Sequence, residues 1–168
     1  LRPYLSDIPN IYFAESTGTL KHWLERFPYS YSFGQRENFA LVRAFSECFK
    51  IPLHVLDFCL SDFVQPPHRL YCCHRWNAME FWNDSKGTNL HAVKAALESF
   101  KNKTNVHWIL GGKSKGENEM LFVETFNLYP SVSCIYLVGE TGKGLSKLSQ
   151  NFNAKTIFCH DLDTVFKR

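Results

Sequence analysis

The sequence lacks the features that would place it in several large classes of protein. No apolar run approaches the roughly 18 residues that a membrane-spanning helix needs. The net charge is only +3, and the basic residues are scattered, so neither a nucleic-acid partner nor a membrane partner is expected. Low-complexity tracts are absent, and 45% of the 168 residues are hydrophobic, which is typical of a globular protein.

The six cysteines show no spacing that indicates a metal site or a disulfide framework. No Cys-x-x-Cys pair occurs, which argues against zinc, and the adjacent Cys72 and Cys73 are poorly placed to bond to each other. Several cysteines lie inside apolar runs, where a reduced thiol behaves as a small core residue. The first ten residues, with Arg2, Asp7 and two prolines, are unlike a signal peptide, so a cytoplasmic location is expected.

Two prolines at 66 and 67 separate parts of the chain whose hydrophobic patterns differ. Before them, apolar residues at helical spacing predict three helices, over 20–27, 38–49 and 53–63. Residues 29–33 alternate aromatic residues with serine, which favours an edge strand. We place a domain boundary at the prolines, which divides the chain into 1–67 and 68–168.

The part after the prolines alternates strand-like runs with helical patterns, repeating at roughly 22 to 28 residues. The strand-like runs are 78–82, 106–110, 133–138 and 156–159, and the helical patterns are 90–100, 118–127 and 145–148. This order predicts βαβ units, and hence an α/β fold with a mostly parallel sheet and flanking helices. Right-handed crossovers would place the carboxyl ends of all four strands along one edge.

A charged turn over residues 83–89 is the first candidate site. It carries Asp84, Ser85, Lys86 and Thr88 between a strand-like run and a helical pattern. Ligands of open α/β sheets bind where a strand feeds a helix, and the helix N-terminus favours anions. The alternative is an ordinary turn in which a serine or threonine caps the helix.

A second candidate follows the run at 106–110 and reads Gly111-Gly112-Lys113-Ser114-Lys115. The glycines permit a tight turn and close approach of a ligand, and the lysines supply positive charge. A solvated loop is the alternative. We expect the turns at 84–88, 111–115 and 139–143 to lie along the same edge of the sheet.

Two further motifs need separate interpretations. Residues 139–144, Gly-Glu-Thr-Gly-Lys-Gly, have the wrong spacing for a phosphate loop and are predicted to form a glycine-rich turn between a strand and a helix. His68-Arg69 lies just beyond the prolines, where an arginine fork could grip phosphate or ribose. A surface pair in a linker is the alternative for His68-Arg69.

Together these motifs resemble those of the Mur ligases, in particular the branch that adds D-glutamate. That branch carries Leu-x-x-Phe-x-x-x-x-His-Arg-(Leu/Phe)-Glu, then Asn-Asp-Ser-Lys-Ala-Thr-Asn about fourteen residues later, then a strand ending in Gly-Gly-x-x-Lys. Matching residues occur here in the same order, at Leu60, Phe63, His68-Arg69-Leu70, 83–89 and 111–115. The resemblance covers residues 34–168 and implies the end of a central ATP-binding domain, followed by a Rossmann-like carboxyl-terminal domain without its last strand.

The resemblance implies that three residues bind ATP and that a fourth lies near its phosphates. Arg69 and Asp84 match residues that hold the ribose and phosphates, and His68 matches a histidine near the phosphates and the metal. Asn38 matches the second asparagine of the family's adenine motif. The implied cofactors are ATP and Mg²⁺, with the metal ligands expected upstream of this chain.

The resemblance also implies the substrates and the reaction. Lys86, Thr88 and Lys115 match residues that bind the carboxylates of D-glutamate. In the complete enzyme, ATP phosphorylates the terminal carboxylate of UDP-N-acetylmuramoyl-L-alanine. The amine of D-glutamate then attacks this acyl phosphate to form an amide. A monomer is expected.

The sequence also departs from the family's pattern. Gly34-Gln35 replaces the His-Asn of the adenine motif, and Tyr71 replaces the glutamate after His-Arg-Leu. Gly87 replaces an alanine, a change that weakens a helix start by up to about 1 kcal/mol. The family's phosphate loop would precede Leu1, and its last strand would follow Arg168.

The sequence therefore predicts part of an ATP-dependent D-glutamate ligase that is inactive by itself. An alternative is a catalytically inactive α/β module of a decayed ligase, which binds a ligand or partner. A dinucleotide-binding Rossmann domain is disfavoured, because no Gly-x-Gly-x-x-Gly follows any strand-like run.

Overall fold

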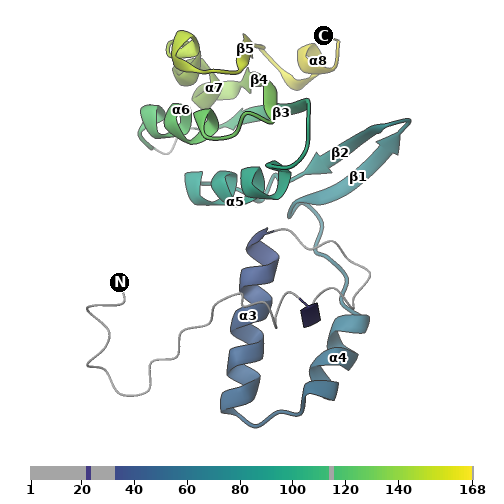
Figure 1. The fold of residues 1–168 in the computed structure, drawn as a ribbon. Coiled ribbons are helices and arrows are strands. Elements are labelled where there is room, and N and C mark those ends of the chain that lie inside the picture. Colours follow the sequence, from purple (N-terminus) through teal and green to yellow (C-terminus); the bar gives the residue numbers. More distant parts are fainter. Residues whose placement is uncertain (1–21, 24–32, 114–115, 168) are drawn as a thin grey trace, which may run out of the picture. The chain divides into compact units, whose positions relative to one another are not determined.

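The computed structural model describes residues 22–23, 33–113 and 116–167 (Figure 1). The chain divides into two compact units, the first ending at Asp84 and the second beginning at Ser85. The predicted boundary at the two prolines stays a prediction. No described helix is long and apolar enough to cross a membrane.

The first unit contains two helices, α3 (Phe33–Cys48) and α4 (Leu53–Ser61). Both were predicted from apolar spacing, but α3 begins five residues earlier than its apolar pattern, because residues 34–37 contain no apolar side chain that would extend the pattern. The helices pack around Trp23, whose indole Nε1 donates a hydrogen bond to Oδ1 of Asp57 at 2.7 Å. Of the predicted helix over 20–27, only His22 and Trp23 are described, and both are helical.

The predicted edge strand over 29–33 falls almost wholly outside the described residues. Its last residue, Phe33, is described and is the first residue of α3 rather than part of a strand.

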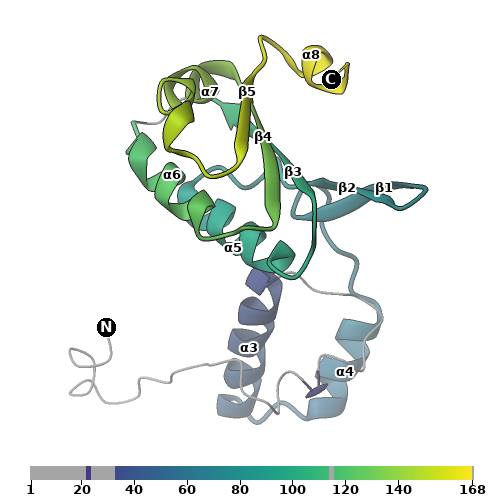
Figure 2. The same cartoon turned by 45° about the horizontal axis from the view of Figure 1, so that its top comes forward.

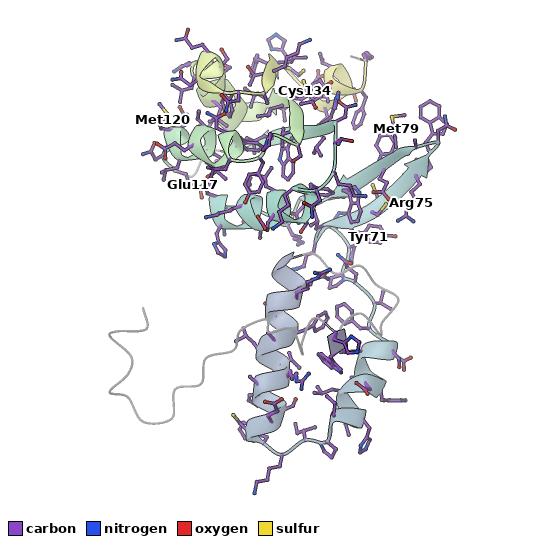
Figure 3. All side chains as sticks on the ribbon, viewed as in Figure 1. Tyr71, Arg75, Met79, Glu117, Met120 and Cys134 are labelled. Atoms are coloured by element: carbon purple, nitrogen blue, oxygen red, sulfur yellow. The ribbon has the colours of Figure 1, made fainter. Side chains whose placement is uncertain are left out.

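A β-hairpin follows the prolines, formed by β1 (Tyr71–Trp76) and β2 (Met79–Asn83). The strands are antiparallel, and Asn77 takes a positive φ of 53° in the connecting turn, which asparagine tolerates well. Figure 3 shows the side chains of Arg75 and Met79 projecting from the hairpin.

The hairpin corrects one part of the predicted fold. The strand expected over 78–82 exists as β2, but it pairs with β1 and does not belong to the parallel sheet. Strand β1 was not predicted, because Tyr-Cys-Cys-His-Arg-Trp has no clear alternation of apolar and polar residues.

The second unit is an α/β fold with a three-stranded parallel sheet in the order β3-β4-β5 (Figure 2). Its strands are β3 (Val106–Gly112), β4 (Val132–Val138) and β5 (Lys155–Phe158). Its helices are α5 (Leu90–Phe100), α6 (Glu119–Asn127), α7 (Gly139–Ser146), the 3₁₀ turn η1 (Ser149–Asn151) and α8 (Leu162–Phe166). The parallel sheet predicted from the alternating pattern is confirmed, and so is the Rossmann-like fold that the resemblance implied.

The core of the second unit lies between the sheet and the helices α5, α6 and α7. Leu97, Ile135, Leu137 and Leu145 are completely buried there. Trp108 packs edge-on against aromatic rings of α5 and α6. This packing fixes the carboxyl ends of β3 and β4, where two of the predicted turns lie.

Helix α7 differs from the prediction for residues 139–144. The expected glycine-rich turn is the helix itself, which starts directly after β4. Glycine is a poor helix former, so three glycines in eight residues hid the helix from sequence reasoning. Packing explains their presence at one position: a Cβ on Gly142 would lie 2.7 Å from the carbonyl carbon of Leu137.

Candidate functional site

The hairpin brings the His68-Arg69-Leu70 turn beside Asp84. Tyr71 pairs with Asn83 at the open end of the hairpin, so the residues that flank this pair become neighbours. The backbone N–H of Leu70 donates a hydrogen bond to Oδ1 of Asp84 at 2.9 Å. Two motifs that are 14 positions apart in the sequence therefore meet, and the hairpin between them accounts for their spacing.

The turn before β1 has an unusual backbone. His68 and Leu70 take positive φ values of 65° and 47°, a conformation that non-glycine residues adopt rarely. Leu70 is buried, whereas the side chains of His68 and Arg69 are exposed. The turn thus presents an imidazole and a guanidinium to solvent, and its buried leucine anchors it.

Gln65, in the segment between α4 and this turn, holds the turn through hydrogen bonds. Its amide Nε2 donates to the carbonyl oxygens of Arg69 and Leu70, at 2.6 and 3.0 Å. Sequence reasoning missed Gln65, since a single glutamine before two prolines carries no recognisable signal.

Asp84 is half-buried, and its surroundings act on its charge in opposite directions. Burial raises the pKa of Asp84 above its ordinary value of 3.8, while the Leu70 N–H and the positive charge of Arg69 lower it. Arg69 is therefore close enough to act on the carboxyl group. A carboxylate next to an arginine suits a ligand with both hydroxyl and phosphate groups. The carboxylate accepts hydrogen bonds from hydroxyl groups, and the arginine guanidinium forms a charged fork with phosphate oxygens.

Lys86 and Thr88 lie at the start of the second unit, just before α5. Both side chains are exposed. The N-cap of α5 is Asn89, whose Oδ1 accepts a hydrogen bond from the N–H of Ala92 at 2.8 Å. The cap is thus an asparagine rather than the expected serine or threonine, while the alternative of an ordinary turn stays open.

The carboxyl ends of β3 and β4 lie side by side, as predicted for the turns after them. Gly112 and Gly139 form a parallel bridge. Strands β3 and β4 approach so closely that a Cβ on Gly111 would lie 2.2 Å from the carbonyl oxygen of Val138. Packing alone therefore explains Gly111, and its presence is no evidence for a ligand.

The prediction that three turns lie along the same edge of the sheet is confirmed only in part. The turn at 84–88 follows β2, which is outside the parallel sheet, so the reason for placing it beside the other two turns was wrong. Lys113 is exposed after β3, whereas Ser114 and Lys115 lie outside the described residues.

Asn38 lies on an exposed side of α3. Within the part of the chain that the structure describes, no group of three or more His, Cys, Asp or Glu side chains could hold a metal ion.

Comparison with known proteins identifies relatives that match most of the chain. The UDP-N-acetylmuramoylalanine–D-glutamate ligase of Leptospira borgpetersenii is 30% identical over 133 residues, which are 79% of this chain and 28% of the relative. The ligase of the same name from Thermotoga maritima is 35% identical over 120 residues, 71% of this chain and 26% of the relative. The one from Buchnera aphidicola is 35% identical over 112 residues, 67% of this chain and 25% of the relative.

Over this stretch the chain is similar to the D-glutamate-adding Mur ligases. It spans about a quarter of the length of the curated relatives it matches. No family model matches it. The resemblance drawn from the motifs is thus confirmed, and in this Mur ligase relative the His-Arg and Asn-Asp-Ser-Lys motifs meet through a hairpin.

Proposed function

We propose that this chain is part of an ATP-dependent ligase that joins D-glutamate to UDP-N-acetylmuramoyl-L-alanine in the synthesis of peptidoglycan precursors. Relatives that carry this activity in their names support the proposal. The single structural observation that carries it is the contact between the His68–Leu70 turn and Asp84. The chain would supply part of the ATP site and part of the D-glutamate site.

In this proposal the first unit binds the nucleotide. Asp84 accepts hydrogen bonds from ribose hydroxyls, and Arg69 binds phosphate oxygens through its guanidinium. His68, exposed in the same turn, lies near the phosphates, and Asn38 binds the adenine. Mg²⁺ belongs to the proposal as the companion of ATP, but none of these residues is assigned as its ligand.

The second unit would bind D-glutamate. Lys86 and Lys115 are cations suited to the two carboxylates, and Thr88 adds a hydroxyl group. Two fixed cations orient a dicarboxylate so that its amine faces the acyl phosphate. Such positioning lowers the barrier because the reacting groups no longer need to find each other.

A second candidate is an inactive binding module derived from such a ligase. Gly34-Gln35 and Tyr71, which depart from the family's motifs, support this candidate. Both candidates keep nucleotide binding at Arg69 and Asp84. Only the ligase candidate, as a complete enzyme, would convert its substrates. An assay of this polypeptide with ATP, D-glutamate and the acceptor is expected to show no turnover, and turnover would show that the chain is sufficient for catalysis.

Binding of ATP to the 168-residue chain tests the nucleotide site. Arg69→Ala is expected to weaken binding by about tenfold or more, because a charged hydrogen bond contributes about 1.5–3 kcal/mol. Arg75→Ala is the matched control. Arg75 is an exposed arginine of the hairpin that follows Arg69, and its side chain pairs with Glu80. Equal losses in both variants, measured by titration calorimetry, would remove Arg69 from the site.

A further inference from the structure

The His68–Leu70 turn is held in a conformation that its residues do not favour. Both His68 and Leu70 have positive φ, and neither is a glycine or an asparagine. Such a backbone persists only where the surroundings determine it strongly, and it is often found where a side chain must be presented to a ligand. The contacts that determine it are therefore informative.

One amide group holds two consecutive carbonyl groups of this turn. Nε2 of Gln65 carries two protons, and it donates to the carbonyl oxygens of Arg69 and Leu70. Fixing both oxygens fixes the two peptide planes that flank Leu70, one between Arg69 and Leu70 and one between Leu70 and Tyr71. The backbone from which the Arg69 side chain extends is thereby held in place.

Asp84 holds the same turn through a different atom. Its Oδ1 accepts from the N–H of Leu70 at 2.9 Å, while Gln65 binds the carbonyl oxygen of the same residue. Leu70 is therefore hydrogen-bonded through both of its backbone polar groups, and its side chain is buried. The turn has little freedom left at this residue.

We propose that Gln65 is a positioning residue, which clamps the turn together with Asp84 so that Arg69 is presented to the phosphates of ATP. This inference rests on the proposed nucleotide site. It adds a residue at a position that the family motif leaves unspecified, and it assigns Gln65 a role through Arg69 rather than through contact with the ligand.

Two substitutions remove the donor in different ways. Gln65→Met keeps a side chain of similar size without a polar group, and Gln65→Glu keeps the shape but places a carboxylate against two carbonyl oxygens. Gln150→Glu is the matched control for the change of charge, since Gln150 is exposed in η1. All variants are made in the 168-residue chain, and amide spectra outside residues 65–70 check that each variant folds.

Two measurements separate the clamp from the ligand site. One-bond Cα–Hα coupling constants report the sign of φ at His68 and Leu70, and titration with ATP reports affinity. We expect Gln65→Met and Gln65→Glu to lose the couplings of positive φ and to bind ATP about tenfold more weakly, whereas Gln150→Glu keeps both.

The outcomes distinguish this inference from the proposed function. Unchanged couplings in both Gln65 variants would overturn the clamp. Altered couplings with unchanged ATP affinity would overturn the positioning role, provided that Arg69→Ala does weaken binding. If the wild-type chain and Arg69→Ala show no ATP binding at all, the proposed function fails, and the positioning role fails with it.

Discussion

The N–H of Leu70 donates a hydrogen bond to Oδ1 of Asp84 at 2.9 Å, and this contact joins the two motifs of the proposed nucleotide site. The contact exists because β1 and β2 pair with Tyr71 opposite Asn83. A shift of the register by one residue would separate Leu70 from Asp84 and would turn every side chain of the strand to the other face. The hairpin is thus a structural requirement of the site.

We expect Asp84→Ala to destabilise the protein more than Asp84→Asn does. Alanine leaves the N–H of the buried Leu70 without an acceptor, a loss of about 1–3 kcal/mol in the free energy of unfolding. Asparagine keeps an acceptor oxygen at the same place. Urea denaturation followed by fluorescence measures both, and equal losses would show that the hydrogen bond contributes nothing.

Stability should depend on pH through Asp84 in a direction opposite to that of most carboxylates. Burial raises the pKa of Asp84 in the folded state, so the folded protein binds the proton more tightly than the unfolded chain does. The contribution of this group is fully present below the unfolded pKa and is lost as the pH rises through the raised folded pKa.

The measurement for this pH effect compares wild type with Asp84→Asn at several pH values. The other carboxylates titrate equally in both proteins and cancel in the difference. The unfolding free energy of wild type minus that of the variant should fall as the pH rises through the acidic range. A difference that rises with pH would mean that Arg69 and the Leu70 N–H outweigh burial.

Two glycines of α7 should respond in opposite ways to alanine. Alanine favours a helix by about 1 kcal/mol over glycine, so propensity alone predicts stabilisation at both positions. At Gly142 the new Cβ would lie 2.7 Å from backbone of Leu137, so we expect a net loss of about 1–3 kcal/mol from overpacking.

At Gly144 the three atoms nearest to the new Cβ all belong to the carboxylate of Glu119, which is the end of a flexible side chain. Glu119 can rotate away, so Gly144→Ala should be neutral or stabilising. Chemical denaturation of both variants measures the contrast. Destabilisation of the same size at both positions would contradict the packing explanation.

Lys86 should affect binding of D-glutamate, whereas Lys94 should not. Both lysines are exposed and only eight positions apart, but Lys94 lies within α5 and outside the charged turn. In the proposed site Lys86 binds a carboxylate, so Lys86→Ala should weaken binding by about tenfold. Chemical-shift titration with D-glutamate measures the affinities, and an equal effect of Lys94→Ala would indicate nonspecific attraction by positive charge.

The same test can be made for Lys115 in a complete enzyme that contains this chain. There we expect Lys115→Ala to raise the KM for D-glutamate strongly. An unchanged KM would remove Lys115 from the pocket.

Much of the fold was predictable because its signals are local. Apolar residues at helical or strand spacing located α4, α5, α6, β3, β4 and β5 to within a few residues. The alternation of these elements predicted the parallel sheet, and the order of the motifs predicted the family. The periodic signals depend only on neighbouring residues, and the alternation and the motifs depend only on linear order, which is why the sequence by itself determined them.

Only the tertiary structure decided which segments meet. The pairing of β2 with β1, the contact between Leu70 and Asp84, and the helix over 139–146 all depend on contacts between distant residues or on packing against a strand. Gln65 gained its role in the same way, because two carbonyl groups come within reach of its amide only after the turn has formed. Local periodicity carries no information on such contacts, since tertiary packing overrides intrinsic propensity.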